Sequence, residues 1–203
     1  MQKILLTLTL FTCLSSCGQS NSKSPPKAVE MDCGPDATVE CSFLNMPGDV
    51  GSIMEIPANS GTPMIITGTI YKADGVTPYP GVALYAYHTD DKGKYSKSGN
   101  ETSVQKWHGR HHGWCKTDSK GKYEIHSIRP ARYPDNTMPA HIHSTIMEPG
   151  GKKYWINDFV FKDDSLVNKE YISSLIGAGD NGIVDLKLSD GKWIGIRDII
   201  LTK

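Results

Sequence analysis

Residues 64–88 decide the fold, and they read MIITGTIYKADGVTPYPGVALYAYH. Two runs rich in Ile, Val, Thr and Tyr, residues 64–72 and 82–88, flank a segment with two glycines and two prolines. β-Branched and aromatic residues favour strands, whereas Gly and Pro end them. The stretch therefore predicts a strand, a turn and a second strand.

The same pattern recurs along the rest of the chain. Further β-rich runs, each bounded by Gly, Pro, Asp or Asn, lie at residues 122–128, 140–147, 153–161, 182–188 and 193–201. Short runs of this kind predict a mostly β fold, a β-sandwich of about seven to nine short strands with at most one or two short helices. The helix candidate is residues 165–176, where apolar residues recur at helical spacing.

Length and charge narrow the classes of function. The chain has 203 residues, which favours one domain over two at about 150 residues per domain. Lys and Arg total 22, as do Asp and Glu, so the formal net charge is zero. Because no basic surplus exists to neutralise phosphates, we expect neither nucleic-acid binding nor electrostatic attachment to an anionic membrane.

The first residues predict an export signal and a lipid anchor. Lys3 precedes an apolar run, residues 4–14, which is too short to span a bilayer but fits a signal-peptide core. Leu14-Ser15-Ser16-Cys17 resembles the bacterial lipobox, in which the cysteine is lipidated and becomes the first residue of the mature protein. Gly18 follows in place of the aspartate that retains such lipoproteins at the inner membrane. The expected location is therefore the bacterial cell envelope, lipid-anchored, at the outer membrane.

The predicted export signal and lipid anchor divide the chain into three parts. Residues 1–16 are the expected signal peptide. Residues 17–30 are the expected lipidated tether, which is flexible because its polar, proline-containing sequence has almost no apolar residue to bury. Residues 31–203 are the single folded domain.

Three cysteines remain once Cys13 leaves with the signal and Cys17 takes the lipid. Cys33 and Cys41 are the natural disulfide pair in an oxidising compartment. Closing this short loop would stabilise the fold by roughly 2.5 kcal/mol in the chain-entropy model. Cys115 is left over, and we expect a buried free thiol without a catalytic role.

A His-x-His pair carries the main chemical signal. Residues two apart in a strand point to the same face, so His141 and His143 can bind one metal ion while Ile142 faces the core. Tyr133 lies in a proline-flanked loop just upstream, and Tyr95 lies at the mouth of another loop. A phenol, with a pKa of about 10, loses its proton to a metal only when the cation is strongly acidic. Two imidazoles and two phenolates together indicate ferric iron.

Beyond this pattern, an ordered set of motifs extends from residue 61 to residue 161. They are Gly68-Thr69-Ile70-Tyr71, the Pro80-Gly81 turn, Gly93-Lys94-Tyr95-Ser96, the turn at residues 117–123, Ile128-Arg129-Pro130 followed by Tyr133, and Pro139-Ala140-His141-Ile142-His143. In this order they resemble the intradiol ring-cleavage dioxygenases, a family that includes catechol 1,2-dioxygenase and protocatechuate 3,4-dioxygenase.

The resemblance implies a non-haem Fe(III) centre bound by Tyr95, Tyr133, His141 and His143 in a β-sandwich. It also implies a small aromatic diol as substrate, cleaved between its two hydroxylated carbons by molecular oxygen. By resemblance, Tyr133 is the tyrosinate that leaves the metal and takes a substrate proton. Fe(III), two phenolates and one hydroxide sum to zero charge, which limits the desolvation cost of a buried site. The particular catechol and the oligomeric state are left open.

One position departs from the family pattern. The residue before Pro139 is usually an arginine in the family, where a cation can stabilise negative charge developing on the substrate, and here it is Met138. Loss of one such group costs on the order of 10²- to 10³-fold in rate. Arg110 lies where the family has a Gly-Arg segment ahead of its Thr-Asp turn, so we expect Arg110 to act as the catalytic substitute. Arg129 and Arg132 also lie nearby in the sequence.

Two interpretations from other classes stay open. The Gly-x-Ile pattern followed by a Pro-Gly turn also looks like transthyretin-like accessory domains, in which case the protein is a non-catalytic envelope module and the two tyrosines are packing residues. Alternatively, the His-x-His pair joins His108, His111 and His112 in a zinc- or copper-binding lipoprotein without redox catalysis. If the glycine-interrupted loop that carries these three histidines binds no metal, we expect it to be exposed to solvent, and we expect the same of Asp163 and Asp164.

Overall fold

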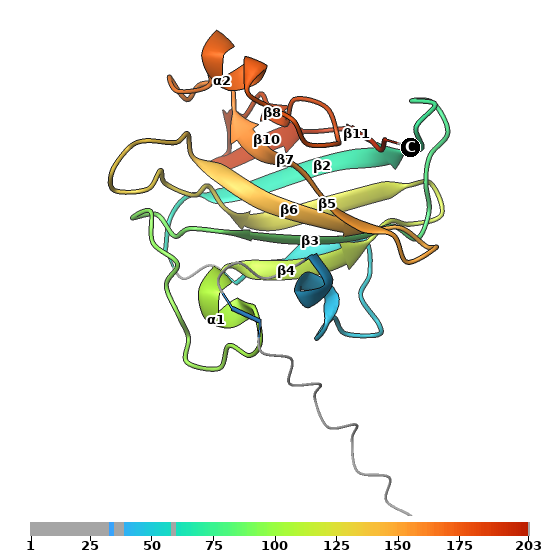
Figure 1. Ribbon diagram of the computed structural model, residues 1–203. Coiled ribbons are helices and arrows are strands. Elements are labelled where there is room, and N and C mark those ends of the chain that lie inside the picture. Colours follow the sequence, from blue (N-terminus) through green and yellow to red (C-terminus); the bar gives the residue numbers. More distant parts are fainter. Residues whose placement is uncertain (1–32, 35–38, 58–59, 203) are drawn as a thin grey trace, which may run out of the picture.

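The two β-rich runs of residues 64–88 form strands that enter different sheets. The structure, a computed structural model, describes residues 33–34, 39–57 and 60–202. Within it the runs form β2 (Pro63–Tyr71) and β3 (Ala83–His88), as predicted. Because β2 and β3 belong to separate sheets, the segment between them crosses the sandwich instead of closing a hairpin (Figure 1).

β2 lies in the middle of a six-stranded sheet. The order is β1 (Ile53–Glu55), β5 (Lys122–Ile128), β2, β10 (Lys192–Ile196) and β9 (Lys187–Ser189), and β11 (Ile199–Ile200) also pairs with β2. β2 runs antiparallel to β5 and parallel to β10 and β11. Its side chains alternate, so that Met64 and Ile66 are fully buried between the sheets.

β3 and β6 form the centre of a five-stranded sheet. The order is β4 (His112–Lys116), β3, β6 (His141–Met147), β7 (Lys153–Phe161) and β8 (Ile183–Val184). Every residue of β3 is buried. One face packs on the other sheet, and the other face is covered by the 3₁₀ helix η1 (Val39–Phe43), whose Phe43 contacts Tyr85 and Tyr87.

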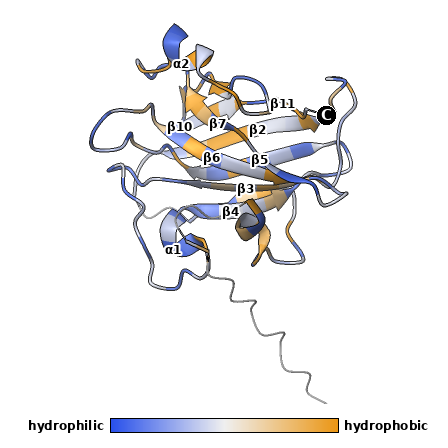
Figure 2. Cartoon of the chain, viewed as in Figure 1, coloured by the Kyte–Doolittle hydropathy of each residue, from blue (hydrophilic) through white to orange (hydrophobic). Residues whose placement is uncertain are grey.

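The core lies between the two sheets. Its members are aliphatic and aromatic side chains from both, including Ile66, Leu84, Ile125, Ile142 and Phe159. Figure 2 shows that hydrophobic residues concentrate in the strands, whereas the connecting loops are largely hydrophilic. The predicted mostly β class is therefore confirmed.

The structure adds detail that the sequence pattern missed. Among the described residues eleven strands form where about seven to nine were expected, and four of them, β1, β8, β9 and β11, have only two or three residues. β4 lies in the histidine-rich segment that was expected to be a solvated loop. Its Gly113 packs against β1, since a Cβ there would lie 2.8 Å from Met54 Cγ. The helices in the described part are α1 (Gln105–His108) and α2 (Lys169–Ser173), the latter inside the predicted range.

Cys33 and Cys41 form a disulfide, the pairing expected from the sequence. The indole Nε1 of Trp107 donates a hydrogen bond to the Cys33 carbonyl at 2.9 Å, which ties the disulfide to the end of α1. Cys115 is a buried free thiol whose pKa is raised by burial to about 12. The predicted signal peptide, Cys17 and the tether lie outside the described residues. Within the described part, no helix has the length and apolar character needed to cross a membrane.

Candidate metal centre

Two loops that are distant in sequence meet at one end of the sandwich. Tyr95 lies in the loop after β3, and Tyr133 lies in the loop between β5 and β6. Hydrogen bonds hold the loops together, because Ala131 N donates to the Asp90 carbonyl at 3.0 Å and Thr89 Oγ1 donates to the Ala131 carbonyl at 2.7 Å. The two phenol oxygens consequently lie 2.6 Å apart.

Gly93 permits this close approach. Its φ of +74° lies in the left-handed region, and a Cβ at this position would lie only 1.9 Å from the Arg132 carbonyl oxygen. A residue with a side chain would be strained and would push the Tyr133 loop away. The glycine is therefore required for the contact that brings Tyr95 and Tyr133 together.

β6 supplies two imidazoles with fixed orientations. Ile142 is fully buried, and His141 and His143 project from the opposite face. His141 Nδ1 lies 2.6 Å from the Pro139 carbonyl oxygen, and His143 Nδ1 lies 3.2 Å from Asp158 Oδ1. Because both partners are acceptors, each Nδ1 carries the proton and each Nε2 presents a lone pair. The two Nε2 atoms lie 3.0 Å apart.

Asp158 is a site residue that the sequence reasoning missed. The pairing of β6 with β7 shifts by one residue between Ile142 and Ser144, so Asn157 and Asp158 both lie opposite His143. This β-bulge allows the Asp158 carboxylate to face the imidazole while Asn157 N bonds to the Ala178 carbonyl. The only available signal was a lone acidic residue within the apolar run of residues 153–161.

Three donor atoms lie around the hydroxyl oxygen of Tyr133. Tyr133 Oη lies 3.3 Å from both His141 Nε2 and His143 Nε2, in addition to its 2.6 Å contact with Tyr95 Oη. Adjacent ligand atoms bound at right angles, each about 2.1 Å from one ion, are about 3 Å apart, so these separations fit a single metal ion. Two facing Nε2 lone pairs repel each other unless a cation or proton lies between them. The donor set therefore fits a metal ion.

The protonation of these groups in the protein alone also depends on burial. Burial raises the pKa of Tyr95, and its hydrogen bond to Tyr133 raises it further. The pKa of Tyr133 is raised as well, again mainly by burial. Burial lowers the pKa of His141, so its imidazole is neutral near pH 7 and available as a ligand. A cation that binds here must be acidic enough to displace the phenol protons.

An aromatic stack supports the centre from behind. The Tyr87 ring stacks on His143 with centroids 4.7 Å apart and on His108 with centroids 3.5 Å apart. His108 Nδ1 is hydrogen-bonded to Tyr85 Oη at 2.9 Å. His111 stacks on the buried His88 instead, with centroids 5.3 Å apart. The only cluster of three metal-ligating side chains among the described residues is His141, His143 and Asp158, so the histidine-rich segment forms no second site there.

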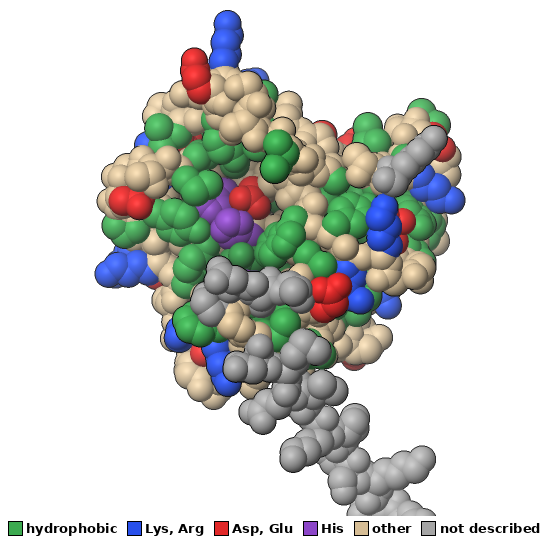
Figure 3. All heavy atoms as spheres, viewed as in Figure 1, with side chains coloured by type: hydrophobic (Ala, Val, Ile, Leu, Met, Phe, Trp, Pro, Cys, Tyr) green, Lys and Arg blue, Asp and Glu red, His purple; other side chains and the backbone are tan. Residues whose placement is uncertain are grey.

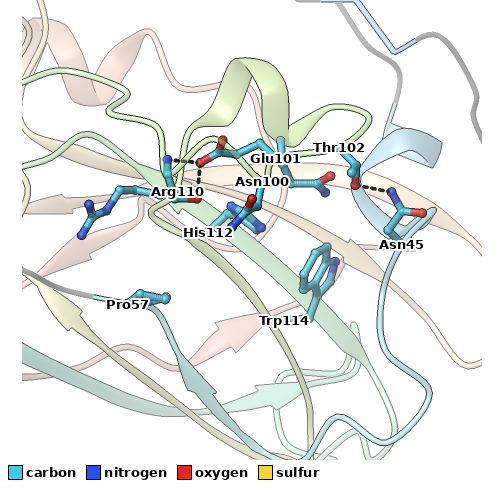
Figure 4. A pocket seen from close by; sticks show the side chains of 10 residues that line it. Asn45, Pro57, Asn100, Glu101, Thr102, Arg110, His112 and Trp114 are labelled. Carbon is cyan, nitrogen blue, oxygen red and sulfur yellow. Dashed lines mark hydrogen bonds between the residues drawn. The ribbon is translucent and has the colours of Figure 1, made fainter. Parts of the chain in front are cut away.

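Arg110 is not brought to this centre by the contacts of the described residues. It lines a separate pocket of about 440 Å³ together with Glu101, His112 and Trp114, and none of the four converging side chains lines that pocket (Figure 4). Its backbone N–H donates to the Ser96 carbonyl at 2.8 Å, which links the segment before β4 to the Tyr95 loop. Arg110 therefore contributes a loop contact, and Figure 4 shows its guanidinium pointing away from the other labelled side chains of the pocket.

Arg129 and Arg132 each pair with a carboxylate. Arg129 binds Asp163 at 2.7 and 2.8 Å, and Arg132 Nε binds Asp164 Oδ2 at 2.9 Å. Asp164 was expected to be exposed, but its side chain is only 4% exposed. It also accepts hydrogen bonds from Ala140 N and Leu166 N, so it joins the Tyr133 loop, the start of β6 and the segment after β7.

Comparison with known proteins gives a family and related folds. A family model described as Dioxygenase matches residues 49–194. The dioxygenase domain of a dioxygenase carbohydrate-binding protein fusion from Streptomyces sp. SirexAA-E is similar in structure, with a TM-score of 0.56 at 18% identity, over 77% of this chain and 92% of that one. Catechol 1,2-dioxygenase from Acinetobacter sp. ADP1 matches with a TM-score of 0.55 at 21% identity, over 76% of this chain and 59% of that one.

Hydroxyquinol 1,2-dioxygenase from Pseudomonas putida DLL-E4 is also similar, with a TM-score of 0.55 at 20% identity, over 77% of this chain and 63% of that one. The present chain thus spans less than two thirds of the length of these last two enzymes. The similarity to all three structures shows a shared β-sandwich fold.

Proposed function

This chain belongs to the intradiol ring-cleavage dioxygenase family, and from this premise we propose that it is a non-haem ferric dioxygenase acting on a catechol-type aromatic. The proposed reaction cleaves the ring between its two hydroxylated carbons and incorporates molecular oxygen. The observation that carries the proposal is that Tyr133 Oη lies 2.6 Å from Tyr95 Oη and 3.3 Å from the Nε2 atoms of His141 and His143, which are themselves 3.0 Å apart.

The chemistry of the donor set supports ferric iron. Tyr95, Tyr133, His141 and His143 would hold the ion, and the two phenolates would offset two of its three positive charges. Zinc and copper(I) sites in proteins more commonly use thiolate and imidazole, and magnesium and calcium sites use carboxylate and carbonyl oxygens. Bound Fe(III) would supply Lewis acidity and a redox centre that activates the aromatic diol toward oxygen.

The protein's own groups have separate tasks in this proposal. The Pro139 carbonyl and the Asp158 carboxylate fix the protons on Nδ1 of the two histidines, so that both Nε2 atoms remain available. The Tyr87 ring holds the His143 ring in position. These contacts pre-organise the imidazole pair before any ligand binds.

Tyr133 is the proposed proton acceptor. Its hydroxyl oxygen lies within 3.3 Å of three other polar atoms of the centre, so a proton can pass between Tyr133 Oη and its neighbours without large movement. The loop that carries Tyr133 is held at its start by Arg132 and at its end by Ala140, both bound to Asp164. This arrangement lets the phenol reorient while the loop stays in place.

The proposal is tested on purified protein loaded with iron. We expect about one iron per chain, a visible absorption band from tyrosinate-to-iron charge transfer, and oxygen uptake with catechol that yields a muconate-type diacid. His143→Ala should lose the band and the iron, whereas Asp190→Asn, a change at an exposed hairpin position, should keep both. A colourless protein that binds no iron, or binds only zinc or copper, would overturn the proposal.

We also propose that the mature protein is attached to the outer membrane of a bacterial cell envelope through lipid on Cys17. The support is the sequence alone, Leu14-Ser15-Ser16-Cys17 after a short apolar run. Several acyl chains on one residue would anchor the protein stably. Cys17→Ser should leave the protein without lipid label and in the soluble fraction, and a soluble wild-type protein would contradict the proposal.

A further inference from the structure

The approach to the metal centre is open on one face of the molecule. Figure 3 shows histidine and carboxylate side chains in a hollow that is ringed by hydrophobic side chains, and no Lys or Arg side chain borders the hollow in that view. The side chains of His143 and Asp158 are 21% and 20% exposed, so both remain within reach of a bound molecule. Both Asp158 oxygens lie 3.1 to 3.2 Å from His143 Nδ1, and this single N–H cannot satisfy all the acceptor capacity of the carboxylate.

The arginines around the centre are already paired with other groups. Arg129 and Arg132 are bound to Asp163 and Asp164. Arg197 Nη2 donates to the carbonyls of Asn157 and Gly179, and it lies 3.4 Å from Asp180 Oδ1. None of these cations contacts Asp158 by an ion pair in the described part of the chain. Asp158 thus forms no ion pair with these guanidiniums, although Arg197 is close enough that the Asp158 charge opposes the lowering of its pKa by burial.

The charge of Asp158 raises the pKa of tyrosines around the centre. After burial, Asp158 and Asp135 raise the pKa of Tyr133, and Asp158 also raises the pKa of Tyr87. Tyr171, in α2, has a pKa that burial and then Asp158 raise to about 12, against the opposing effect of Arg197. The charged side chains that act on Tyr133 are Asp158 and Asp135, both carboxylates, whereas Arg197 acts in the opposite direction on Tyr171.

An exposed aromatic side chain packs against Tyr87, the ring that stacks on His143. Trp155 is 39% exposed on β7, and its ring meets Tyr87 edge-on with centroids 6.5 Å apart. Met138, which stands before the Pro139 that orients His141, is apolar and 38% exposed. Exposed aromatic faces beside a carboxylate are the surroundings that organic ammonium groups prefer, through cation–π contact and charge pairing.

We propose that Asp158 selects catechols whose substituent is cationic, such as an alkylammonium chain, and disfavours catechols that carry a carboxylate. This inference rests on the proposed function, since it assumes that the diol binds at the metal centre. The physical reason is that a partly desolvated carboxylate attracts an ammonium group and repels a carboxylate more strongly than an exposed one would. Asp158 is thereby a specificity-determining residue, beyond its role in orienting His143.

The test measures binding without turnover. The iron-loaded protein is titrated without oxygen with three catechols of similar size, 4-(2-aminoethyl)catechol, 4-propylcatechol and 3,4-dihydroxyphenylacetate, and Kd is read from the change in visible absorption. We expect the ammonium compound to bind about tenfold more tightly than the neutral one, and the carboxylate about tenfold more weakly. Raising the salt concentration from 50 to 500 mM should reduce both differences.

Two matched variants test whether the charge of Asp158 causes the differences in affinity among the three catechols. Asp158→Asn removes the charge but keeps an oxygen that can accept from His143 Nδ1, so the three compounds should then bind within about threefold of one another. Asp190→Asn, in the exposed β9–β10 turn, should retain the wild-type order. If Asp158→Asn does not fold, the salt dependence of the wild-type differences serves as the test.

The possible results separate the two proposals. Equal affinities, or tighter binding of the carboxylate compound, would overturn the inference about Asp158 and leave the dioxygenase proposal intact. A protein whose spectrum responds to none of the three compounds would overturn the proposed function and the inference with it.

Discussion

Replacing Gly93 by alanine should dismantle the metal centre without touching any of its ligands. The added Cβ would lie 1.9 Å from the Arg132 carbonyl oxygen, whereas an ordinary contact needs about 3.4 Å. The Tyr133 loop must therefore move by about 1.5 Å relative to the Tyr95 loop. Metal–ligand distances tolerate about 0.2 Å, so a shift of this size separates the two phenols from one ion.

The variant should also be less stable. The left-handed φ of +74° costs alanine about 1 kcal/mol, and the forced loop movement adds about 1–3 kcal/mol. For a chain of this size 1 kcal/mol corresponds to about 2–4 °C, so a loss of about 2–4 kcal/mol should lower Tm by about 4–16 °C. Gly191→Ala is the matched control, because Gly191 has φ +75° but no atom within 4 Å of a Cβ. It should lose only about 2–4 °C and keep its iron.

Iron content after dialysis, visible absorption and thermal unfolding together measure these effects. We expect Gly93→Ala to lose the visible band and most of its iron at a temperature where both proteins are folded. If Gly93→Ala kept full iron and an unaltered band, the contact between the two loops would not be what brings Tyr95 and Tyr133 together.

Three further predictions concern other parts of the site. Asp164→Asn should lower the free energy of unfolding at pH 7 by about 3 kcal/mol, because it leaves Arg132 without its buried partner. Burial opposes ionisation of Asp164, but hydrogen bonds from Arg132 and two backbone N–H groups lower its pKa overall. The stabilisation by ionised Asp164 is therefore complete above the unfolded pKa of about 4 and is lost as the pH falls through the folded pKa. The free energies of unfolding of wild type and variant, measured by denaturant titration, should converge below pH 4 and differ at pH 7. The same difference at both pH values would contradict this. Tyr133→Phe should bind iron with a shifted, weaker visible band and lose at least tenfold in the rate of catechol oxidation, and wild-type oxygen uptake would remove Tyr133 as the proton acceptor. The double variant Cys33→Ser, Cys41→Ser should have a free energy of unfolding about 2.5 kcal/mol lower than wild type in urea titrations. An unchanged midpoint would mean that the disulfide does not restrict the unfolded chain.

Local patterns in the sequence account for much of the fold. The runs at residues 122–128 and 153–161 match β5 and β7 at both ends, because alternation and bounding turn residues are properties of each segment alone. The runs at 182–188 and 193–201 each split into two shorter strands, since the paired stretches depend on partners. The sequence did not predict β4, because its glycine and histidines are typical of a loop. Its strand conformation comes from pairing with β3.

The four proposed ligands of the centre could be predicted from the sequence, whereas the residues that contact them could not. His141 and His143 follow from the two-residue period of a strand, and Tyr95 and Tyr133 from their place in a motif order. The contact of Asp158 with His143 depends on a bulge between two paired strands, which no single segment encodes. Arg110 was predicted as the catalytic cation from its place in a Gly-Arg segment of the motif order; it lines a pocket that none of the four proposed ligands lines, and its catalytic role stays a prediction.

The sequence by itself determined the mostly β class, the His-x-His strand and the family, because each rests on short-range order along the chain. Only the tertiary structure decided that two tyrosine loops meet across Gly93, that Arg129 and Arg132 each pair with a carboxylate, and that Asp158 contacts His143. The physical reason is that distances between loops and the pairing of charges are set by how the two sheets pack and by the register between their strands.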